Sequence, residues 1–364
     1  MASDSKFTMR PQAGFSLIEI LVGLVIGLLA TLVIMQVFSV FEGQKRTTTG
    51  SADAQTNGSI ALYTISHELK MAGFGLLPTL NTPLDCATLT FGGTGITDIS
   101  PVVITDGGAG AGASDTITIH DGNSDSGGVP SQITGTGLLG VDDVTLDNNL
   151  ACHVGDVALI INGNVCNLTN VTGPTDLAVP PVSTGNTTSV TLASPAGAIV
   201  GANLSCLGSW VTTVFRINPN YNPTNAANSQ AYLERSGQPS VADIVNIQAQ
   251  YGISAVANSN QVTNWVDATG ATWAAPSVPD RNRIKAIHIA VVARNGLLEK
   301  DNVTGTCTTA KGTVNNGPCA WDDSNFDPAP AIDLSNDPNW QRYRYRVFET
   351  IIPLRNVIWA KSTL

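Results

Sequence analysis

The chain has 364 residues, enough for one large domain or two medium ones, and 13% of them are charged while 43% are hydrophobic. This composition excludes a coiled-coil rod and a charge-rich disordered chain, and its 35 glycines and 19 prolines stop short of a low-complexity linker. The formal net charge is -10. A mostly acidic surface repels phosphate backbones, so we expect no bulk nucleic-acid binding.

An apolar run near the N-terminus is the strongest feature of the sequence. Phe15–Phe41 is 27 residues long and carries one charged residue, Glu19. As a helix it would be roughly 40 Å long, whereas a bilayer core needs only about 20 residues. No later stretch is comparable, so we predict a single membrane span, with Lys6 and Arg10 keeping the N-terminus cytoplasmic. The run is too long for a secretory signal peptide, and no A-x-A cleavage site follows it.

Glu19 is a costly residue at the start of a spanning helix. An acidic side chain at mid-bilayer costs about 2.5–3.5 kcal/mol, and less near the end of the span. Cleavage between Gly14 and Phe15 would create an amine one helical turn from Glu19, so the two groups could pair within a chain or between chains. The alternative is a tolerated interfacial glutamate that reaches out to water.

The segment from Gly14 to Glu19, GFSLIE, followed by an apolar helix, resembles the class III signal of type IV prepilins and type II secretion pseudopilins. The resemblance implies that residues 1–14 are a leader, which prepilin peptidase removes on the cytoplasmic face of the inner membrane. It also implies that the same enzyme methylates the amine of Phe15. Glu19 would then pair with the Phe15 amine of a neighbouring subunit as the helices bundle into a filament core.

Gly23 and Gly27 form a G-x-x-x-G spacing within the apolar run. Such a spacing lets two helices approach closely, in lipid or in a filament. The alternative is that small residues are simply common in spanning helices. With Glu19, these glycines are the candidate residues for subunit assembly.

The second part of the expected helix, residues 42–73, is polar with one apolar stripe. The stripe consists of Leu62, Ile65, Leu69 and Ala72. Its 3-4-3 spacing places these side chains on one face, which would dock on an outer domain. Gly50 and Gly58 cost about 1 kcal/mol each relative to alanine, so we expect the helix to loosen or break near them. The GFG text at 73–75 predicts the C-terminal end of the helix.

Residues 52–75 also resemble the minor pilins of the PilW family. The matching residues are Asn57, Gly58, Ala61, Leu62, Leu69, Met71, Ala72 and Gly73. The chain departs from that pattern at His67-Glu68 and Lys70, where acidic and arginine positions are usual. The C-terminal text at 342–359 fits the same family, which tends to end on a strand leading to an arginine-asparagine pair, here Arg355-Asn356.

Residues 74–364 read as strands and loops, with a large β-rich insertion around 80–240. Alternating or apolar strand patterns cover 115–120, 154–162, 187–192, 245–253 and 284–293. The last of these is apolar on both faces, as a central strand would be. We therefore predict an α+β fold, in which a long N-terminal helix packs on a mostly antiparallel, β-rich domain. The sequence leaves open whether the insertion is a separate domain.

The six cysteines fit an extracytoplasmic compartment, because none forms a CxxC pair and their number is even. Pairing by closeness in the sequence predicts Cys307–Cys319 and Cys152–Cys166, which leaves Cys86–Cys206. Six cysteines allow 15 connectivities, and free buried thiols are the alternative.

No motif indicates an enzyme, a cofactor or a metal. The text GTGLLG at 135–140 matches GxGxxG, but no helical pattern follows it. Asp121, Asn123 and Asp125 begin like a calcium loop, but Ser126 and Gln132 replace the required glycine and glutamate. The acidic region 322–337 is better explained as a solvated loop. The four histidines are dispersed, without HExxH, and no G-x-S-x-G is present.

Arg342, Arg344 and Arg346 alternate with tyrosines, and on a strand they would share one face. The simpler explanation is a charged face that discourages edge pairing. The alternative is a docking patch for an acidic neighbouring subunit or for DNA.

The sequence thus favours a non-catalytic minor pilin that primes or caps a type IV pilus, with a place at its tip. Expected partners are prepilin peptidase, other minor pilins, the major pilin, the inner membrane before assembly and a tip adhesin. The alternatives are a J-type minor pseudopilin of type II secretion, and a membrane-anchored adhesin or hydrolase that uses a pilin-type export signal.

Overall fold

The computed structural model describes residues 14–76, 86, 88–92, 98–125, 127–137, 142–148, 152–173, 188–225 and 228–359. It divides into two compact units, residues 1–51 and 52–364. Of the expected leader, only Gly14 lies among the described residues.

Helix α1 runs from Leu17 to Met71 without interruption. Up to Phe41 its large apolar side chains are exposed on every side, so no part of the described chain buries them. Among the described residues, α1 is the one helix long and apolar enough to cross a membrane. The expected loosening near Gly50 and Gly58 is wrong. A cost of about 1 kcal/mol per glycine is small beside the cooperative hydrogen bonding of a 55-residue helix.

A four-stranded antiparallel sheet forms the centre of the second unit. Its order is β14 (Val262–Asp267), β13 (Ile244–Ser254), β15 (Ile284–Arg294) and β18 (Tyr345–Pro353). Every residue of β13 and β15 is buried, and β15 has a partner strand on each side. The prediction that 284–293 is a central strand is therefore confirmed. The polar residues that alternate with apolar ones in 245–253 face loops and are buried. The alternation therefore does not mark a water-exposed face of the strand.

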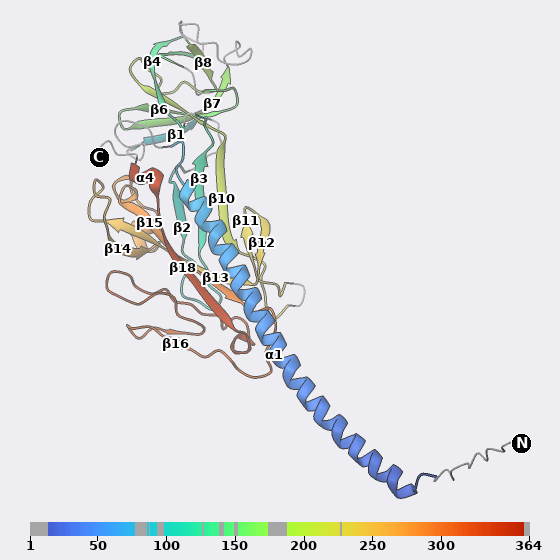
Figure 1. Ribbon diagram of the computed structural model, residues 1–364. Helices are drawn as coiled ribbons and strands as arrows, with labels where there is room; N and C mark the ends of the chain where they lie inside the picture. Colours follow the sequence, from blue (N-terminus) through green and yellow to red (C-terminus); the bar gives the residue numbers. More distant parts are fainter. Residues whose placement is uncertain are drawn as a thin grey trace, which may run out of the picture. The chain divides into compact units, whose positions relative to one another are not determined.

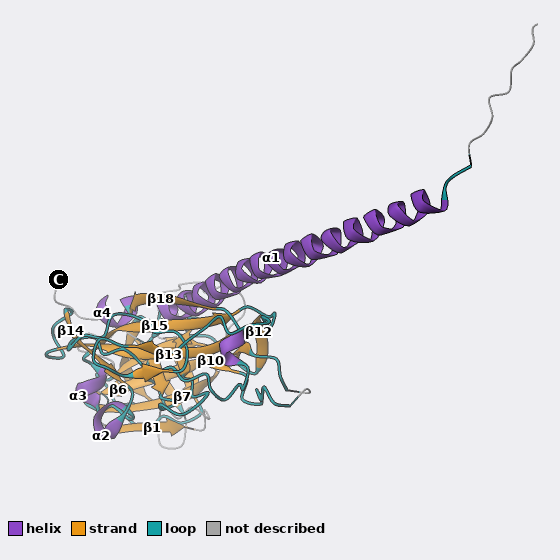
Figure 2. Ribbon diagram, turned by 90° about the horizontal axis from the view of Figure 1, so that it is seen from below, coloured by secondary structure: helices purple, strands orange, loops and turns teal. Residues whose placement is uncertain are grey.

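The last turns of α1 lie beside β18 in both views (Figures 1 and 2). Ile65, Leu69 and Ala72 are almost fully buried, and Leu62 packs against the same core cluster. The predicted apolar stripe is thus confirmed. It extends toward the N-terminus through the small residues Ala54, Gly58 and Ala61.

A five-stranded antiparallel sheet packs against the same core. In order, its strands are β12 (Gln238–Ala242), β11 (Tyr232–Arg235), β10 (Trp210–Ile217), β3 (Thr116–Gly122) and β2 (Val102–Thr105). The buried hydroxyl of Tyr251, on β13, accepts a hydrogen bond of 2.6 Å from the N–H of Ile104 on β2. This bond ties the two sheets together at the core.

The insertion folds as a small closed barrel, which Figure 1 shows at the top in green. Its strands follow in the order β7 (Val165–Gly173), β6 (Val157–Asn162), β9 (Asn203–Gly208), β4 (Pro130–Thr136), β5 (Asp143–Leu146) and β8 (Thr188–Leu192). Because β8 also pairs with β7, the ring closes. Strand β1 (Thr88–Gly92) adds to β7 in parallel, and the other strand pairs are antiparallel. The barrel has its own core cluster, lined by residues such as Ile133, Val190 and Leu204.

The remaining described elements are short. They are α2 (Gly270–Trp273), α3 (Val278–Arg281), β16 (Cys307–Thr308), β17 (Val314–Asn315), the 3-10 helix η2 (Trp340–Arg342) and α4 (Arg355–Trp359). The predicted α+β class is confirmed: a long N-terminal helix with a mostly antiparallel, β-rich domain.

The disulfides correct two of the predicted pairs. The bonds are Cys86–Cys166, Cys152–Cys206 and Cys307–Cys319, so only the last follows the prediction. Cys152–Cys166 and Cys86–Cys206 are wrong because side chains of a barrel wall alternate between its two faces. Cys166 points to the main core beside Cys86, whereas Cys206 points into the barrel core beside Cys152. Closeness in sequence carries no information about which face a cysteine occupies.

Candidate functional site

The start of α1 is a closed hydrogen-bond arrangement made by Ser16 and Glu19. The Ser16 Oγ accepts from the N–H of Ile18 at 3.3 Å, and Glu19 Oε2 accepts from the N–H of Ser16 at 3.1 Å. This is a capping box, in which two backbone donors of the first helical turn gain side-chain acceptors. The carboxylate also sits where the helix dipole favours negative charge. Glu19 therefore stabilises its own helix in the uncleaved chain.

The geometry places Glu19 close to the expected cleavage point. Its hydrogen-bond partner, the Ser16 N–H, follows Phe15 directly in the chain. A carboxylate that already reaches the backbone at Ser16 is suited to attract an ammonium group formed one residue earlier.

Gly23 and Gly27 leave open space along the same helix. A Cβ atom built on either glycine would meet no heavy atom within 4 Å. Packing within the described chain therefore does not explain these two glycines. Their role in subunit assembly stays a prediction.

The far end of α1 is anchored by hydrogen bonds to other elements. Asn356, at the start of α4, donates through Nδ2 to the carbonyls of Met71 and Ala72 at 3.2 and 3.1 Å. The N–H of Gly73 donates to the His120 carbonyl, and the N–H of Gly122 donates to the Phe74 carbonyl. The two Asn356 bonds satisfy carbonyl acceptors that a helix terminus otherwise leaves unpaired. The arginine-asparagine pair noted in the sequence contains this capping residue.

Gly58 permits the close approach of α1 to β18. A Cβ atom at Gly58 would lie 2.0 Å from the ring of Phe348, which is much shorter than any allowed contact. The helix is also held by an ion pair of 2.6 Å between Glu68 and Arg235 on β11. The glycine that weakens the isolated helix is thus required by its docking on the sheet.

Two family models match the chain. The model described as type IV pilus-assembly protein W matches residues 221–356, about a third of the chain. The model of the prokaryotic N-terminal methylation motif matches residues 9–35. No curated protein and no solved structure gives a match.

The two matches support a type IV pilus minor pilin of the PilW family. The methylation motif contains the candidate cleavage point and the capping box. The PilW match contains the four-stranded sheet and ends at Asn356, the residue that caps α1.

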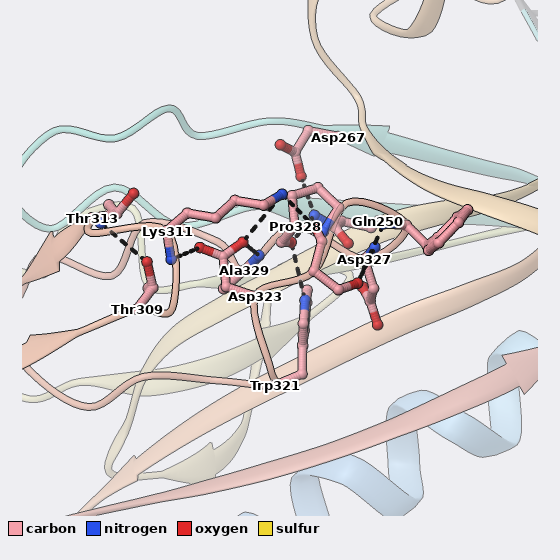
Figure 3. A network of polar contacts seen from close by, with 12 residues as sticks. Gln250, Asp267, Thr309, Lys311, Thr313, Trp321, Asp323, Asp327, Pro328 and Ala329 are labelled. Atoms are coloured by element: carbon pink, nitrogen blue, oxygen red, sulfur yellow. Dashed lines mark hydrogen bonds and ion pairs between the residues drawn. The ribbon is translucent and has the colours of Figure 1, made fainter.

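On the face of the sheet opposite to α1, polar residues of β13 and β15 contact the loops that cover the sheet. Gln250, on β13, donates to Asp267 at 2.6 Å and to the Pro328 carbonyl at 2.8 Å (Figure 3). The same carbonyl accepts from Trp321 Nε1 at 3.0 Å. Lys311 pairs with Asp323, whose carboxylate also accepts from the N–H of Ala329. Gln250 therefore joins the loop that follows β17 to the sheet, and the other polar bonds hold the loop itself together.

His288 lies buried under this loop. Its ring stacks on Trp321 with centroids 3.8 Å apart, and Nδ1 lies 3.3 Å from an Asp327 carboxylate oxygen. Burial lowers the pKa of His288, although the nearby charges of Asp327 and Glu349 oppose this shift. The neutral imidazole is the form that suits this packing.

The three arginines near the C-terminus do not share a strand face, contrary to the expectation. Arg342 lies in η2 and donates to the Glu299 carbonyl, and Arg344 pairs with the Glu299 carboxylate before β18 begins. Only Arg346 belongs to the strand. The strand starts at Tyr345, where pairing with β15 becomes possible, and the preceding turn at Trp340 breaks the alternation.

The rejected chemical motifs gain no support from the described residues. No group of three or more His, Cys, Asp or Glu side chains in those parts of the chain is placed to hold a metal ion. The GxGxxG text begins in β4, and its residues 138–140 lie outside the described residues. His67 is on α1, while His120 hydrogen-bonds the Ser100 carbonyl and stacks on Trp210.

Sequence reasoning missed residues that act through tertiary contacts. Phe348 and Asp115 carry no local signal. The Asp115 carboxylate accepts from the N–H groups of Gly107 and Ala249, at 2.9 and 2.7 Å. Burial raises its pKa to about 7. A lone aspartate at the start of a predicted strand could have been noted, but nothing in the sequence identified its partners.

Proposed function

We propose that this minor pilin is a non-catalytic assembly subunit that helps to prime or cap the pilus, at or near its tip. Prepilin peptidase removes residues 1–14 and methylates Phe15. The chain first spans the inner membrane once, with its N-terminus cytoplasmic, and then enters the filament. The observation that carries this proposal is the methylation motif at the start of α1, a helix whose last turns pack on a sheet matched by the PilW model.

The capping box explains how Glu19 is tolerated before assembly. Its carboxylate is engaged with its own helix terminus, which offsets part of the cost of placing a charge near lipid. Cleavage then creates a cationic amine at Phe15, adjacent to the Ser16 N–H that this carboxylate already accepts. In a filament, each Glu19 would pair with the Phe15 amine of a neighbouring subunit, such as the major pilin or another minor pilin.

The processing step is tested by Gly14→Ala. A bulkier residue before the scissile bond should block leader removal, so the protein should run as the larger precursor. Gln12→Ala is the matched control and should be processed normally. Mass spectrometry that still finds a methylated Phe15 at the start of the Gly14→Ala protein would refute the processing claim.

The pairing step is tested by two substitutions at Glu19. Glu19→Gln keeps an acceptor for the capping box but removes the charge, whereas Glu19→Leu removes both. We expect both variants to be inserted and cleaved, and neither to be recovered in sheared pili. Glu42→Gln, which removes the next carboxylate along α1, should assemble normally. Recovery of Glu19→Gln at the wild-type level would show that the charge is not needed.

Partners are tested by co-purification. Sheared pili that contain the wild-type chain should also yield other minor pilins, at a low ratio to the major pilin. A chain found only in the membrane fraction, with no pilin attached, would contradict a role in assembly.

A further inference from the structure

A polar cavity opens at the end of β15, where segments far apart in the sequence meet. Its volume is about 420 Å³, within the roughly 300–1,000 Å³ range of small-molecule sites. Polar side chains line most of it, including Tyr232, Asp243, Arg294, Asn339 and Tyr343. They come from β11, the β12–β13 turn, the end of β15 and both flanks of η2.

Arg294 is the buried centre of this cavity, with 6% of its surface exposed. Its Nη1 donates to the Tyr221 hydroxyl at 3.1 Å and to Asp337 at 3.3 Å, and its guanidinium lies 4.3 Å from the ring centroid of Tyr343. Its Nε has no hydrogen-bond partner in the part of the chain that the structure describes. The guanidinium is therefore held in place, and its Nε donor is buried without an acceptor among the described residues.

Asp243 supplies an acceptor at the cavity wall. It occupies a left-handed backbone conformation, with φ of 58°, between β12 and β13. One carboxylate oxygen is 3.6 Å from Arg294, and the side chain is 29% exposed. A Cβ atom on the neighbouring Gly296 would lie 2.9 Å from the other oxygen, so the glycine keeps space open beside this carboxylate.

The charges of the cavity decide what class of ligand fits. Asp243 and Asp337 together outweigh Arg294 by one negative charge, which disfavours an anion. A cation would lie beside the guanidinium, which repels it. A neutral ligand with several hydroxyl groups avoids both penalties, because each hydroxyl donates to a carboxylate and accepts from a guanidinium or an amide. The tyrosine rings offer faces to the C–H groups of such a ligand.

We propose that this cavity binds a neutral sugar unit of a glycan. The site is separate from the N-terminal assembly residues and would give the minor pilin a binding function in addition to assembly. Asp243 and Arg294 would form hydrogen bonds to neighbouring hydroxyls, and Asn339 would add an amide at the opposite flank of η2 from Tyr343.

The test uses the full-length chain in a detergent without a sugar headgroup. The probes are the methyl glycosides of glucose, galactose, mannose and N-acetylglucosamine, with saturation-transfer NMR titrations as the readout. We expect saturable binding of at least one glycoside. Binding should be at least about tenfold weaker to Asp243→Asn, which replaces a charged acceptor by a neutral amide, and to Asn339→Ala, which removes an amide. Asp142→Asn, an exposed carboxylate on the barrel, should bind like the wild type.

Gly296→Ala is a second variant that retains every polar group. Its methyl group should displace the Asp243 carboxylate and weaken binding, and its unfolding midpoint reports whether the fold is preserved. The proposal is overturned if no glycoside saturates, or if folded Gly296→Ala and Asn339→Ala bind like the wild type. It is also overturned if a lysine amide binds in a salt-sensitive manner while the glycosides do not.

Discussion

The two parts of α1 share one backbone geometry but bury their apolar residues in different ways. Between Leu17 and Phe41 the apolar side chains surround the helix, and Leu24 is 65% exposed. From Ala54 onward most of the apolar residues form one stripe, and Ile65 and Leu69 are fully buried. The stripe is buried within the chain, whereas the apolar side chains between Leu17 and Phe41 need a membrane or other helices to cover them. The first part is therefore built for association and the second for docking.

Glycines in the two parts illustrate the same difference. Gly43 meets nothing within 4 Å, so its only intrinsic effect is the weaker helix propensity of glycine. Gly58 is required by the ring of Phe348. The same residue type is thus a cost in one part of the helix and a packing requirement in the other.

The largest expected effect comes from the buried stripe. Ile65→Ala should lower the free energy of unfolding of the β-rich unit by about 2–5 kcal/mol, because it leaves a cavity under α1. Ile60→Ala, at a position on the same helix that is 48% exposed, should change it by less than about 0.5 kcal/mol. Denaturant titrations of both variants measure the difference. Equal effects would mean that the docked face of α1 is misassigned.

A second test concerns Asp115, which joins the start of β3 to β13. Its pKa is raised by burial to about 7, so folding favours its protonated form. This contribution to stability is complete below about pH 4 and is lost as the pH rises to 7. Asp121 acts in the same direction, because burial and then the nearby Glu68 raise its pKa to about 6.

Unfolding titrations between pH 4 and 8 should therefore show stability falling with pH. Asp115→Asn should remove most of the fall between pH 6 and 7, while Asp142→Asn should leave it unchanged. An unaltered slope in Asp115→Asn would contradict the assignment.

An alanine should be tolerated at Gly43 but not at Gly58. Gly58→Ala should destabilise the β-rich unit by about 1–3 kcal/mol, because its methyl group overlaps the Phe348 ring. Phe348→Ala in the same chain should relieve much of this penalty, giving a coupling that a double-mutant cycle detects. Gly43→Ala should not destabilise the protein. Additive effects of Gly58→Ala and Phe348→Ala would argue against their contact.

The smallest effect is expected at the helix end. Asn356→Ala removes two hydrogen bonds to the carbonyls of Met71 and Ala72, and should cost about 1 kcal/mol. Hydrogen exchange should show faster opening in the last turns of α1. Asn356→Asp keeps the size but loses the donor, so it should be at least as destabilising as alanine.

The helix and several strands could be predicted because their signals are local. The apolar stripe from Leu62 to Ala72 and the apolar run at 284–293 follow from spacing and composition alone. The barrel closure could not be predicted, since it depends on β8 meeting β7 across a long separation. The predicted pairs Cys152–Cys166 and Cys86–Cys206 were wrong for the same reason, because the face that Cys166 occupies is a property of the closed sheet.

By itself the sequence determined the N-terminal methylation motif, the apolar run from Phe15 to Phe41 and the existence of a β-rich domain, since each depends on neighbouring residues. Only the tertiary structure decided that Gly58 is a contact point, that Asn356 caps α1, and that Arg294 is the centre of a polar cavity. Hydrophobic periodicity specifies which face of an element is buried, but not against what. The partner of each face is fixed by long-range packing, in which residues distant along the chain compete for the same space.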